Sequence, residues 1–412
     1  MAQTKVEASS SRYTLSSFTH DQAARIVTIV WGDGHESRFA FIWLRHGEFF
    51  PALGRPEQAS DAWCLLPEPP EAAVLGSINC NDCSLEIHWS HDGSTTRHDL
   101  AWLRDNCTSL EARRARQPKP QLWSGEDAAG FDWFDAGDME DPATRMSLLE
   151  HVRDRGLALV RNVSVEPGTV MEFARYFGPV RRTHHGSLFN IRSLPRDRQG
   201  PRVGIGATAA NAQAPHTDEG FRHATLGIML FHCLKPDPSG GGRSMFADGI
   251  AAAEALRISD PEAFDFLTTV PLVQAAERNP QERFRTRGRI IATDTLGVVR
   301  GVKVADRTMP PPDLAENQVE PAYRAIRAFF AQLYAPERLF ERCLQPGEMA
   351  IFDNQRVLHG RRAFNPDAGE RCIQQVSVER DEFHNTFRQL AEQVGRFDLS
   401  NWEPDAGILS QA

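Results

Sequence analysis

The sequence predicts a mainly β protein, and three patterns carry this prediction. Residues 349–352 form a short apolar run that follows the turn dipeptide Pro346-Gly347 and ends in polar residues, as a buried strand does. Pro215 precedes the triplet His216-Thr-Asp218, and its fixed φ and missing N–H indicate that the triplet starts a strand or ends a loop. The third pattern is a pair of hairpin-like segments near the N-terminus.

The hairpin pattern occurs twice and predicts a separate small β-rich domain over residues 13–115. Residues 27–34 lead to 41–45, and residues 85–89 with Asp92-Gly93 lead to 101–104. In each copy, alternating residues precede a polar turn and then a second strand that ends in Trp-Leu-Arg. The tryptophans of the two copies are the expected core anchors, namely Trp31, Trp43, Trp89 and Trp102.

Composition sets the remaining boundaries. We expect residues 1–12 to be disordered, and residues 116–144 to form a linker because most of this stretch is rich in proline, glycine and acidic residues. Residues 145–412 then form the second, larger domain. A chain of 412 residues with 41% hydrophobic residues has enough apolar material for two cores.

Charge and cysteine content argue against several classes of partner. The net charge is −9 and the basic residues are scattered, so we expect no nucleic-acid surface. We find no apolar run long enough to span a bilayer and no signal-peptide pattern, so we expect no membrane partner and a cytoplasmic protein. The seven irregularly spaced cysteines do not form the pattern of a disulfide framework.

His216, Asp218 and His359 form a candidate metal site. Residues i and i+2 of an extended chain share one face, so a His-x-Asp pair can direct both side chains to one ion. His359 must then come from a second strand that lies alongside. Two imidazoles and one carboxylate hold non-haem Fe(II) on one triangular face and leave the opposite positions open for a co-substrate and O2. Because His-x-Asp triplets also occur by chance, the neighbouring motifs decide between a metal site and an incidental pair.

A series of motifs accompanies these residues in order along the chain: 156–162, 173–180, Pro215-His-Thr-Asp218, 231–234, 240–248 and 346–362. Arg371 lies twelve residues after His359. Over residues 145–398 this set resembles the iron(II)/2-oxoglutarate-dependent oxygenases of the taurine dioxygenase superfamily, and within it the γ-butyrobetaine hydroxylase branch. Relatives in that branch also carry a small N-terminal domain, which extends the resemblance over nearly the whole chain.

The resemblance implies a double-stranded β-helix, a jelly-roll sandwich flanked by helices, as the oxygenase domain over residues 145–412. It also implies Fe(II) as the cofactor, with 2-oxoglutarate and O2 as co-substrates. Arg371 matches the family's arginine for the far carboxylate of 2-oxoglutarate, and the guanidinium fork suits that task. Ser244 stands where the family has a threonine hydroxyl for the same carboxylate. A surface salt bridge is the alternative role for Arg371, and its spacing after His359 favours the co-substrate site.

The implied reaction is hydroxylation of an aliphatic C–H of a small polar substrate, which is amino-acid-, betaine- or phosphonate-like, with release of succinate and CO2. Asp218 disfavours halogenation, because related halogenases replace this carboxylate with a small residue. The same iron site also supports desaturation, cyclisation or C–C cleavage, and the sequence does not separate these outcomes. A non-catalytic jelly-roll binding protein is a third hypothesis, and the joint presence of His216, Asp218, His359 and Arg371 argues against it.

Two sets of residues are candidates for the substrate pocket. His185, Phe189, Thr208 and Ser377 match positions at which trimethylammonium-binding relatives form an aromatic cage, and only Phe189 is a carbocyclic aromatic residue. The sequence therefore favours a remodelled pocket. Arg287 and Arg289 belong to an arginine-rich segment and are candidates for binding a carboxylate or phosphonate. A solvated strand edge is the alternative for these arginines.

The relatives also hold a zinc ion in the small domain and commonly form dimers. The matching stretch here, 46–53, contains no cysteine, and the pair Cys80-Asn-Asp-Cys83 lies later, at an expected turn between strands. Four-coordinate zinc needs two further ligands, and the available residues lack convincing spacing: Cys64, Cys107, His88, His91 and His98. The sequence therefore predicts loss of the structural zinc, and the resemblance implies a homodimer that acts on a small-molecule substrate.

Overall fold

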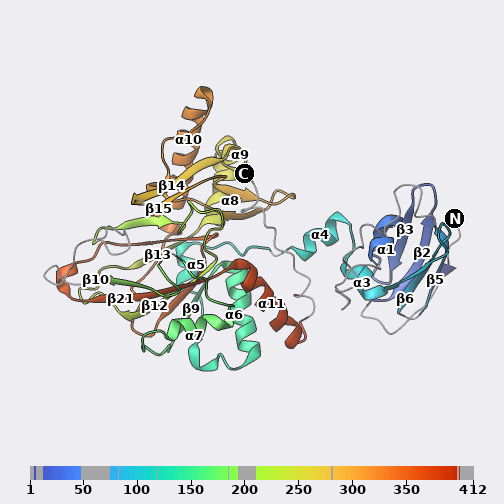
Figure 1. The fold of residues 1–412 in the computed structure, drawn as a ribbon, viewed down its shortest axis with the longest axis horizontal. Helices are drawn as coiled ribbons and strands as arrows, with labels where there is room; N and C mark the ends of the chain where they lie inside the picture. The colour runs from blue at the N-terminus through green and yellow to red at the C-terminus, as the bar shows by residue number, and fades with distance from the viewer. Residues whose placement is uncertain are drawn as a thin grey trace. The chain divides into compact units, whose positions relative to one another are not determined.

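The computed structural model describes residues 4–5, 13–47, 75–81, 83–117, 119–183, 185–193, 210–279, 282–396 and 399. The chain divides into two compact units, Met1–Gln117 and Pro118–Ala412 (Figure 1). The candidate residues Thr208 and Cys64 lie outside the described residues, as do most of residues 1–12. Thr4–Lys5 nevertheless form strand β1, which pairs with β2, so the expected disorder does not extend to these two residues.

The first unit contains two antiparallel sheets, with strand orders β1-β2-β3-β4 and β5-β6-β7. Both sheets contribute to one core, in which Trp31 and Trp89 are fully buried. Trp43 and Trp102 are half-buried and stack with ring centroids 5.2 Å apart. The strands are β1 (Thr4–Lys5), β2 (Leu15–Asp21), β3 (Ile26–Trp31), β4 (Glu36–Ala40), β5 (Leu75–Cys80), β6 (Ser84–Trp89) and β7 (Thr95–Asp99), and the helices are α1 (Phe41–Gly47), α3 (Leu100–Asp105) and α4 (Leu110–Arg116).

The two Trp-Leu-Arg motifs lie on helices, so the prediction that they end strands is wrong. Strands β4 and β7 stop before the motifs, which fall within α1 and α3. Asp99 caps α3, because its side chain accepts a hydrogen bond from the backbone N–H of Trp102 at 2.8 Å. Leu100 and Leu103 are three residues apart and therefore share the buried face of the helix. The alternating pattern of the preceding strands hid the change from the two-residue period of a strand to the 3.6-residue period of a helix.

The second unit is built on two sheets that face each other. One has the strand order β10-β21-β12-β19-β9-β8, and the other has the order β11-β20-β13-β18. Side chains from both fill the space between them: Phe352 of the first sheet contacts Phe246 of the second, with ring centroids 5.5 Å apart. All pairings in these sheets are antiparallel except that of β8 with β9. The predicted jelly-roll sandwich is confirmed.

The strands of the second unit are β8 (Trp133–Asp135), β9 (Leu157–Arg161), β10 (Phe189–Ser193), β11 (Gln213–His216), β12 (Ile228–Lys235), β13 (Ser244–Asp248), β14 (Leu272–Asn279), β15 (Glu282–Gly288), β16 (Ile291–Thr293), β17 (Val299–Val302), β18 (Phe340–Arg342), β19 (Met349–Asp353), β20 (Val357–Arg361) and β21 (Arg371–Val378). Its helices are α5 (Gly125–Ala129), α6 (Pro142–Arg155), α7 (Thr169–Phe173), α8 (Gly249–Ser259), α9 (Pro261–Thr269), α10 (Glu316–Leu333) and α11 (Arg380–Gln393), with short 3-10 turns between elements.

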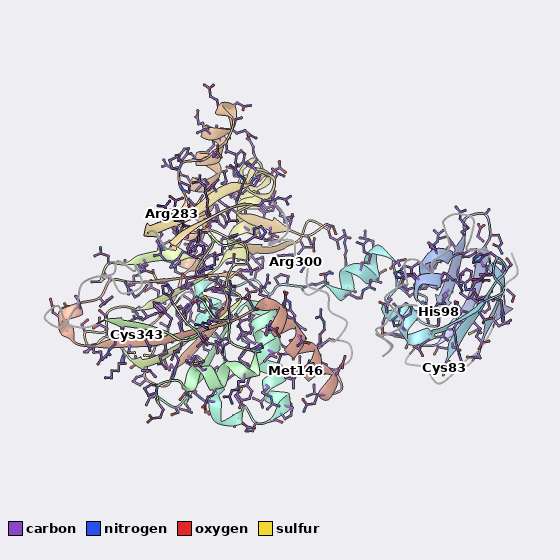
Figure 2. All side chains as sticks on the ribbon, viewed as in Figure 1. Cys83, His98, Met146, Arg283, Arg300 and Cys343 are labelled. Carbon is purple, nitrogen blue, oxygen red and sulfur yellow. The ribbon has the colours of Figure 1, made fainter. Side chains whose placement is uncertain are left out.

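Helices cover the sandwich on two sides (Figure 1). On one side, α6, α7 and α11 pack against the six-stranded sheet. Met146, labelled on α6 in Figure 2, belongs to this core. Phe387 of α11 and Ile351 of β19 are members of the same core. On the other side, α8, α9 and α10 form a second core with β16 and β17. Among the described residues, none of these helices is both long enough and apolar enough to cross a bilayer.

Much of the stretch expected to be a linker belongs to the second unit. Residues 118–144 contain α5, and strand β8 extends the six-stranded sheet by pairing in parallel with β9. Trp123 is buried, and its indole N–H donates to the carbonyl of Arg155 at 2.7 Å. The proline and glycine content of the stretch therefore reflects tight turns between short elements instead of an extended connection.

A buried ion pair joins the strands of the second unit to the former linker. Arg356 donates to both carboxylate oxygens of Asp248, at 2.9 and 3.2 Å, and to the carbonyls of Gln121 and Asp154. The two charged side chains are 3% and 0% exposed. We predict that Arg356→Met lowers the free energy of unfolding by about 3–5 kcal/mol, because the substitution leaves the carboxylate buried and unpaired.

Urea titration of the full chain, followed by hydrogen exchange of second-unit amides, measures this loss. The matched control is Arg362→Met, which removes an exposed pair with Glu341 and should cost less than about 1 kcal/mol. Equal losses in the two variants would contradict the account of the buried pair.

Candidate metal centre

Strand pairing brings the two candidate histidines together. Strands β11 and β20 are antiparallel, and their register places His216 opposite His359. Opposite residues on one face of an antiparallel pair are close neighbours, and the two ring centroids lie 4.6 Å apart. His216 is the last residue of β11, so Asp218 lies beyond the strand and does not share a strand face with His216. Asp218 reaches the histidines because the chain turns after β11.

The three side chains converge on one point. The distance from His216 Nε2 to Asp218 Oδ1 is 3.1 Å, and that from His359 Nε2 to Asp218 Oδ2 is 3.5 Å. One ligand atom from each residue lies within 4.8 Å of the others. The Nδ1 of His216 lies 2.9 Å from the carbonyl of Ala214, which fixes Nδ1 as the donor and leaves the Nε2 lone pair facing the carboxylate. The donor set and its orientation fit a divalent metal held on one face.

The charge states of these groups suit metal binding. Burial raises the pKa of Asp218, but the neighbouring His359 and His216 outweigh this effect and hold the pKa well below its usual range. Burial lowers the pKa of His359, and the opposing attraction of Asp218 does not restore it. An ionised carboxylate and a neutral imidazole are the forms that coordinate a metal ion.

Hydrogen bonds fix the backbone that carries the ligands. Asp218 donates its N–H to Asn354 Oδ1 at 2.9 Å, and Asn354 Nδ2 donates back to the Asp218 carbonyl at 3.0 Å. Thr217 donates its N–H to the carbonyl of Val304 at 2.8 Å. The His-x-Asp segment is therefore held from both sides, by the loop after β19 and by the chain that follows β17.

A pocket opens over the three ligands, and it contains most of the predicted site residues. Ser244 and Arg371 line it together with His185, Phe189 and Ser377. The rings of His185 and Phe189 stack with centroids 4.7 Å apart. The hydroxyl of Ser377 is buried and has no hydrogen-bond partner among the described residues. The structure thus gathers residues that are distant in sequence at the mouth of the sandwich.

Arg371 is a buried cation in this pocket. The residue is 7% exposed, and burial lowers its pKa. Its side chain makes no hydrogen bond or ion pair with another described residue, and its guanidinium carbon lies 5.9 Å from the ring centroid of Phe364. A buried guanidinium without an acidic partner is a site for an anion that comes from outside the chain.

Arg287 and Arg289 do not line the pocket. Arg287 lies on β15, in the β14–β15 hairpin, and is exposed; it pairs with Asp313 and donates to the carbonyl of that residue at 3.0 Å. The placement of Arg287 matches the alternative of a solvated strand edge, whereas Arg289 follows β15 and is half-buried. Arg283, labelled in Figure 2, is also exposed on this hairpin.

Sequence reasoning missed several residues that line the pocket. Phe221, Arg307 and Gln375 were not candidates. Gln375 lies on β21 at even spacing from Arg371 and Ser377, so alternation along a strand predicts a common face for the three. Arg307 carries no comparable signal, because it lies on a single 3-10 turn, Asp306–Thr308.

The residues considered for zinc lie in the first unit. Cys80 ends β5 and Cys83 precedes β6, so the pair lies at the predicted turn between strands. Cys107 is buried, with its sulfur 3.2 Å from His35 Nε2. Within the described part of the chain, three or more metal-ligating side chains come together only at His216, Asp218 and His359. Loss of the zinc site stays a prediction.

Gly360 controls the separation of the two strands that carry the histidines. A Cβ at this position would lie 2.6 Å from the carbonyl oxygen of Gln213 and 2.9 Å from the nitrogen of Pro215. We predict that Gly360→Ala pushes β11 away from β20 and weakens Mn(II) binding roughly 10- to 100-fold, as outer-sphere changes at metal sites do.

Mn(II) titration monitored by electron paramagnetic resonance tests this prediction. Gly288→Ala is the matched control, because a Cβ at Gly288 would meet nothing within 4 Å. Unchanged Mn(II) affinity in the Gly360 variant would show that β11 tolerates the added methyl group.

The fold and the metal site together define a class of protein. A jelly-roll sandwich that presents two histidines and one aspartate beside a pocket with a buried arginine is a non-haem iron oxygenase.

The comparisons identify the family: this chain belongs to the Taurine catabolism dioxygenase TauD, TfdA family, whose model matches residues 114–376. It is 32% identical to the gamma-butyrobetaine dioxygenase of Pseudomonas sp. (strain AK-1) over 365 residues, which cover 86% of this chain and 91% of the relative. It is 28% identical to the mitochondrial trimethyllysine dioxygenase of Bos taurus, with 93% of this chain and 92% of the relative covered. A solved structure of asparagine oxygenase aligns with a TM-score of 0.47 and 20% identity over 58% of this chain and 80% of the other.

The protein is therefore a 2-oxoglutarate-dependent non-haem iron dioxygenase. Its cofactor is Fe(II), its co-substrates are 2-oxoglutarate and O2, and it acts on a small molecule. The resemblance stated from the motifs is confirmed.

Proposed function

We propose that this enzyme hydroxylates an aliphatic C–H of a small polar substrate. The observation that carries the proposal is the single pocket in which His216, Asp218 and His359 converge near the buried, unpartnered guanidinium of Arg371. In the balanced reaction, R–H, 2-oxoglutarate and O2 give R–OH, succinate and CO2. One oxygen atom of O2 enters the product and the other enters succinate.

The ligand residues and Arg371 have separate roles in this proposal. His216, Asp218 and His359 would hold Fe(II), which supplies the activation of O2 coupled to decarboxylation of 2-oxoglutarate. Arg371 would bind the far carboxylate of 2-oxoglutarate through two parallel N–H donors, and Ser244 would add its hydroxyl from the neighbouring sheet. The Phe231 and Phe352 rings pack around His359 and exclude water from the inner side of the site.

The substrate class follows from the relatives and from the pocket lining. The two relatives are named for γ-butyrobetaine and trimethyllysine, so an amino-acid- or betaine-like compound is the first class to test, and a phosphonate is the second. His185 and Phe189 form a stacked pair in the wall, whereas Ser377 and Gln375 are polar. This lining supports a substrate that combines one flat or apolar contact with several hydrogen bonds, and the lining residues that the structure describes do not form a full aromatic cage.

Desaturation, cyclisation and C–C cleavage use the same iron site and remain the alternative outcomes. A succinate-release screen over quaternary amines, amino acids and phosphonates identifies the substrate. Mass spectrometry of products formed under 18O2 then separates the outcomes, since hydroxylation adds one labelled oxygen to the substrate and desaturation adds none. A coupled product without 18O would contradict the proposed hydroxylation.

Residence in the cytoplasm and assembly into a homodimer stay predictions from the sequence and its resemblance. Light scattering of the purified chain measures the second of these directly, as a particle mass equal to twice 46.1 kDa.

A further inference from the structure

The chain that follows β17 is built onto the metal-ligand segment and carries Arg307 into the pocket. Val304 accepts the N–H of Thr217 at 2.8 Å and donates its own N–H to Thr217 Oγ1 at 3.3 Å. Gln274 donates to the carbonyl of Lys303 at 2.7 Å and accepts from Thr308 Oγ1 at 3.2 Å. Thr217 lies between the ligands His216 and Asp218, so these bonds fix the position of the 3-10 turn relative to the metal.

The guanidinium of Arg307 lies directly beside a metal ligand. Its Nη2 donates to His216 Nε2 at 2.7 Å, and the residue lines the pocket although it is otherwise exposed. Among the described residues, no carboxylate lies within ion-pair distance of this side chain.

Metal binding removes the one hydrogen-bond acceptor that Arg307 has there. The lone pair of His216 Nε2 cannot both coordinate a metal ion and accept a hydrogen bond. The metal ion also repels the guanidinium, since both are cations. A bound metal ion would therefore release the Arg307 donors from His216, and the hydrogen bonds of the turn would keep the Arg307 backbone beside the pocket.

A different arginine is available for 2-oxoglutarate. Arg371 lies at the start of β21 beside Phe364, and the guanidinium carbon of Arg361 lies 4.6 Å from the centroid of the same ring. Burial lowers the pKa of Arg361 to about 10, with smaller contributions in the same direction from the charges of Arg371 and Arg307. Four arginines line the pocket, namely Arg181, Arg307, Arg361 and Arg371. Arg307 lies on the 3-10 turn and Arg371 on β21, so the two come from different elements of the fold.

We propose that Arg307 binds an anionic group of the primary substrate, so that the substrate of this enzyme is an acid held by its carboxylate or phosphonate next to the metal. This inference rests on the proposed function, because it assigns Arg371 to the co-substrate. The planar guanidinium fork matches either anion in bidentate geometry. Arg307 replaces Arg287 and Arg289 as the anion-binding candidate, since those residues do not line the pocket.

Binding of matched probes tests the proposal without requiring turnover. The full-length enzyme is loaded with Mn(II) and N-oxalylglycine, a non-reacting analogue of 2-oxoglutarate, and titrated calorimetrically. The probes are γ-butyrobetaine, L-norvaline and 3-aminopropylphosphonate, each paired with its amide or diester, the partner in which the acidic group is neutral and the ammonium group is unchanged. We expect at least one acid to bind roughly 10- to 100-fold more tightly than its neutral partner, as the loss of a charge-assisted pair implies.

The variants are Arg307→Gln, Arg307→Lys and the control Arg283→Gln. Arg307→Gln should abolish the preference for the acid and leave the affinity for N-oxalylglycine within about two-fold, while Arg307→Lys should retain part of the preference. Arg283 lies on the exposed hairpin outside the pocket, so its variant should behave as the wild-type enzyme. Retained N-oxalylglycine affinity also shows that each variant is folded.

Three results would overturn the assignment. The first is that no acid binds to the wild-type enzyme more tightly than its neutral partner. The second is that Arg307→Gln keeps the preference for the acid. The third is that Arg307→Gln lowers the affinity for N-oxalylglycine instead, which would place Arg307 in the co-substrate site. Failure of the proposed function gives a different result. In that case the wild-type enzyme binds no N-oxalylglycine but still binds the acids through Arg307.

Discussion

His216→Ala is expected to abolish succinate formation from 2-oxoglutarate. The substitution removes one of three metal bonds and the partner that faces His359 across β11 and β20. Changes in the outer sphere alone reduce metal affinity or activity about 10- to 100-fold, so loss of a ligand should lower the rate by more than about a thousand-fold. The measurement is succinate release at saturating Fe(II), 2-oxoglutarate and O2.

The control for this variant is His223→Ala, which removes an exposed histidine that does not line the pocket. Its rate should equal that of the wild-type enzyme. Succinate formation by His216→Ala at more than a tenth of the wild-type rate would exclude His216 from the metal site, provided that the rate still depends on Fe(II).

Arg371→Ala is expected to raise the KM for 2-oxoglutarate roughly 30- to 150-fold, because a hydrogen-bonded pair of charges contributes about 2–3 kcal/mol. The kcat at saturating co-substrate should change much less, since the far carboxylate is distant from the reacting carbon. Arg371→Lys should recover part of the affinity, as it keeps the charge but loses the bidentate fork.

Arg192→Ala provides the matched control. Arg192 pairs opposite Cys372 on the neighbouring strand, and its exposed side chain binds Glu370 instead of facing the pocket. The KM for 2-oxoglutarate should stay unchanged in this variant. An unchanged KM in Arg371→Ala would show that another cation, such as Arg361, receives the carboxylate.

The fold was predictable where the sequence repeats a local period or carries a strong turn. Residues 349–352 form the central part of β19, and the hairpin patterns form sheets in the first unit. The prediction that the Trp-Leu-Arg motifs end strands is wrong because the alternating pattern of the preceding residues stops where each helix begins. The cap made by Asp99 is the local signal that shows where the period changes.

The metal ligands were predictable from chemistry, whereas their meeting required the fold. The residue types at 216, 218 and 359 indicate a non-haem iron set, but only the register of β11 with β20 brings His359 opposite His216. This register depends on long-range packing, including the close approach that Gly360 permits. Sequence spacing alone does not determine it.

The arginines show the limit of sequence reasoning most clearly. Arg287 and Arg289 were chosen because arginines are dense in that segment, and the hairpin carries Arg287 to an exposed partner, Asp313. Arg307 stands alone in a stretch without periodicity. Its approach to the metal depends on hydrogen bonds between Thr217 and Val304, two residues that are 87 positions apart.

Anaerobic titration with visible absorption spectroscopy tests the central claim most directly, because chelation of Fe(II) by a 2-oxo acid produces a charge-transfer band. The band is expected to form with the wild-type enzyme only when Fe(II) and 2-oxoglutarate are both present, and His359→Ala, which lacks one of the two imidazoles, should fail to form it. A band of full intensity in His359→Ala, or no band in the wild-type enzyme, would contradict the assignment of His216, Asp218 and His359 as the iron site.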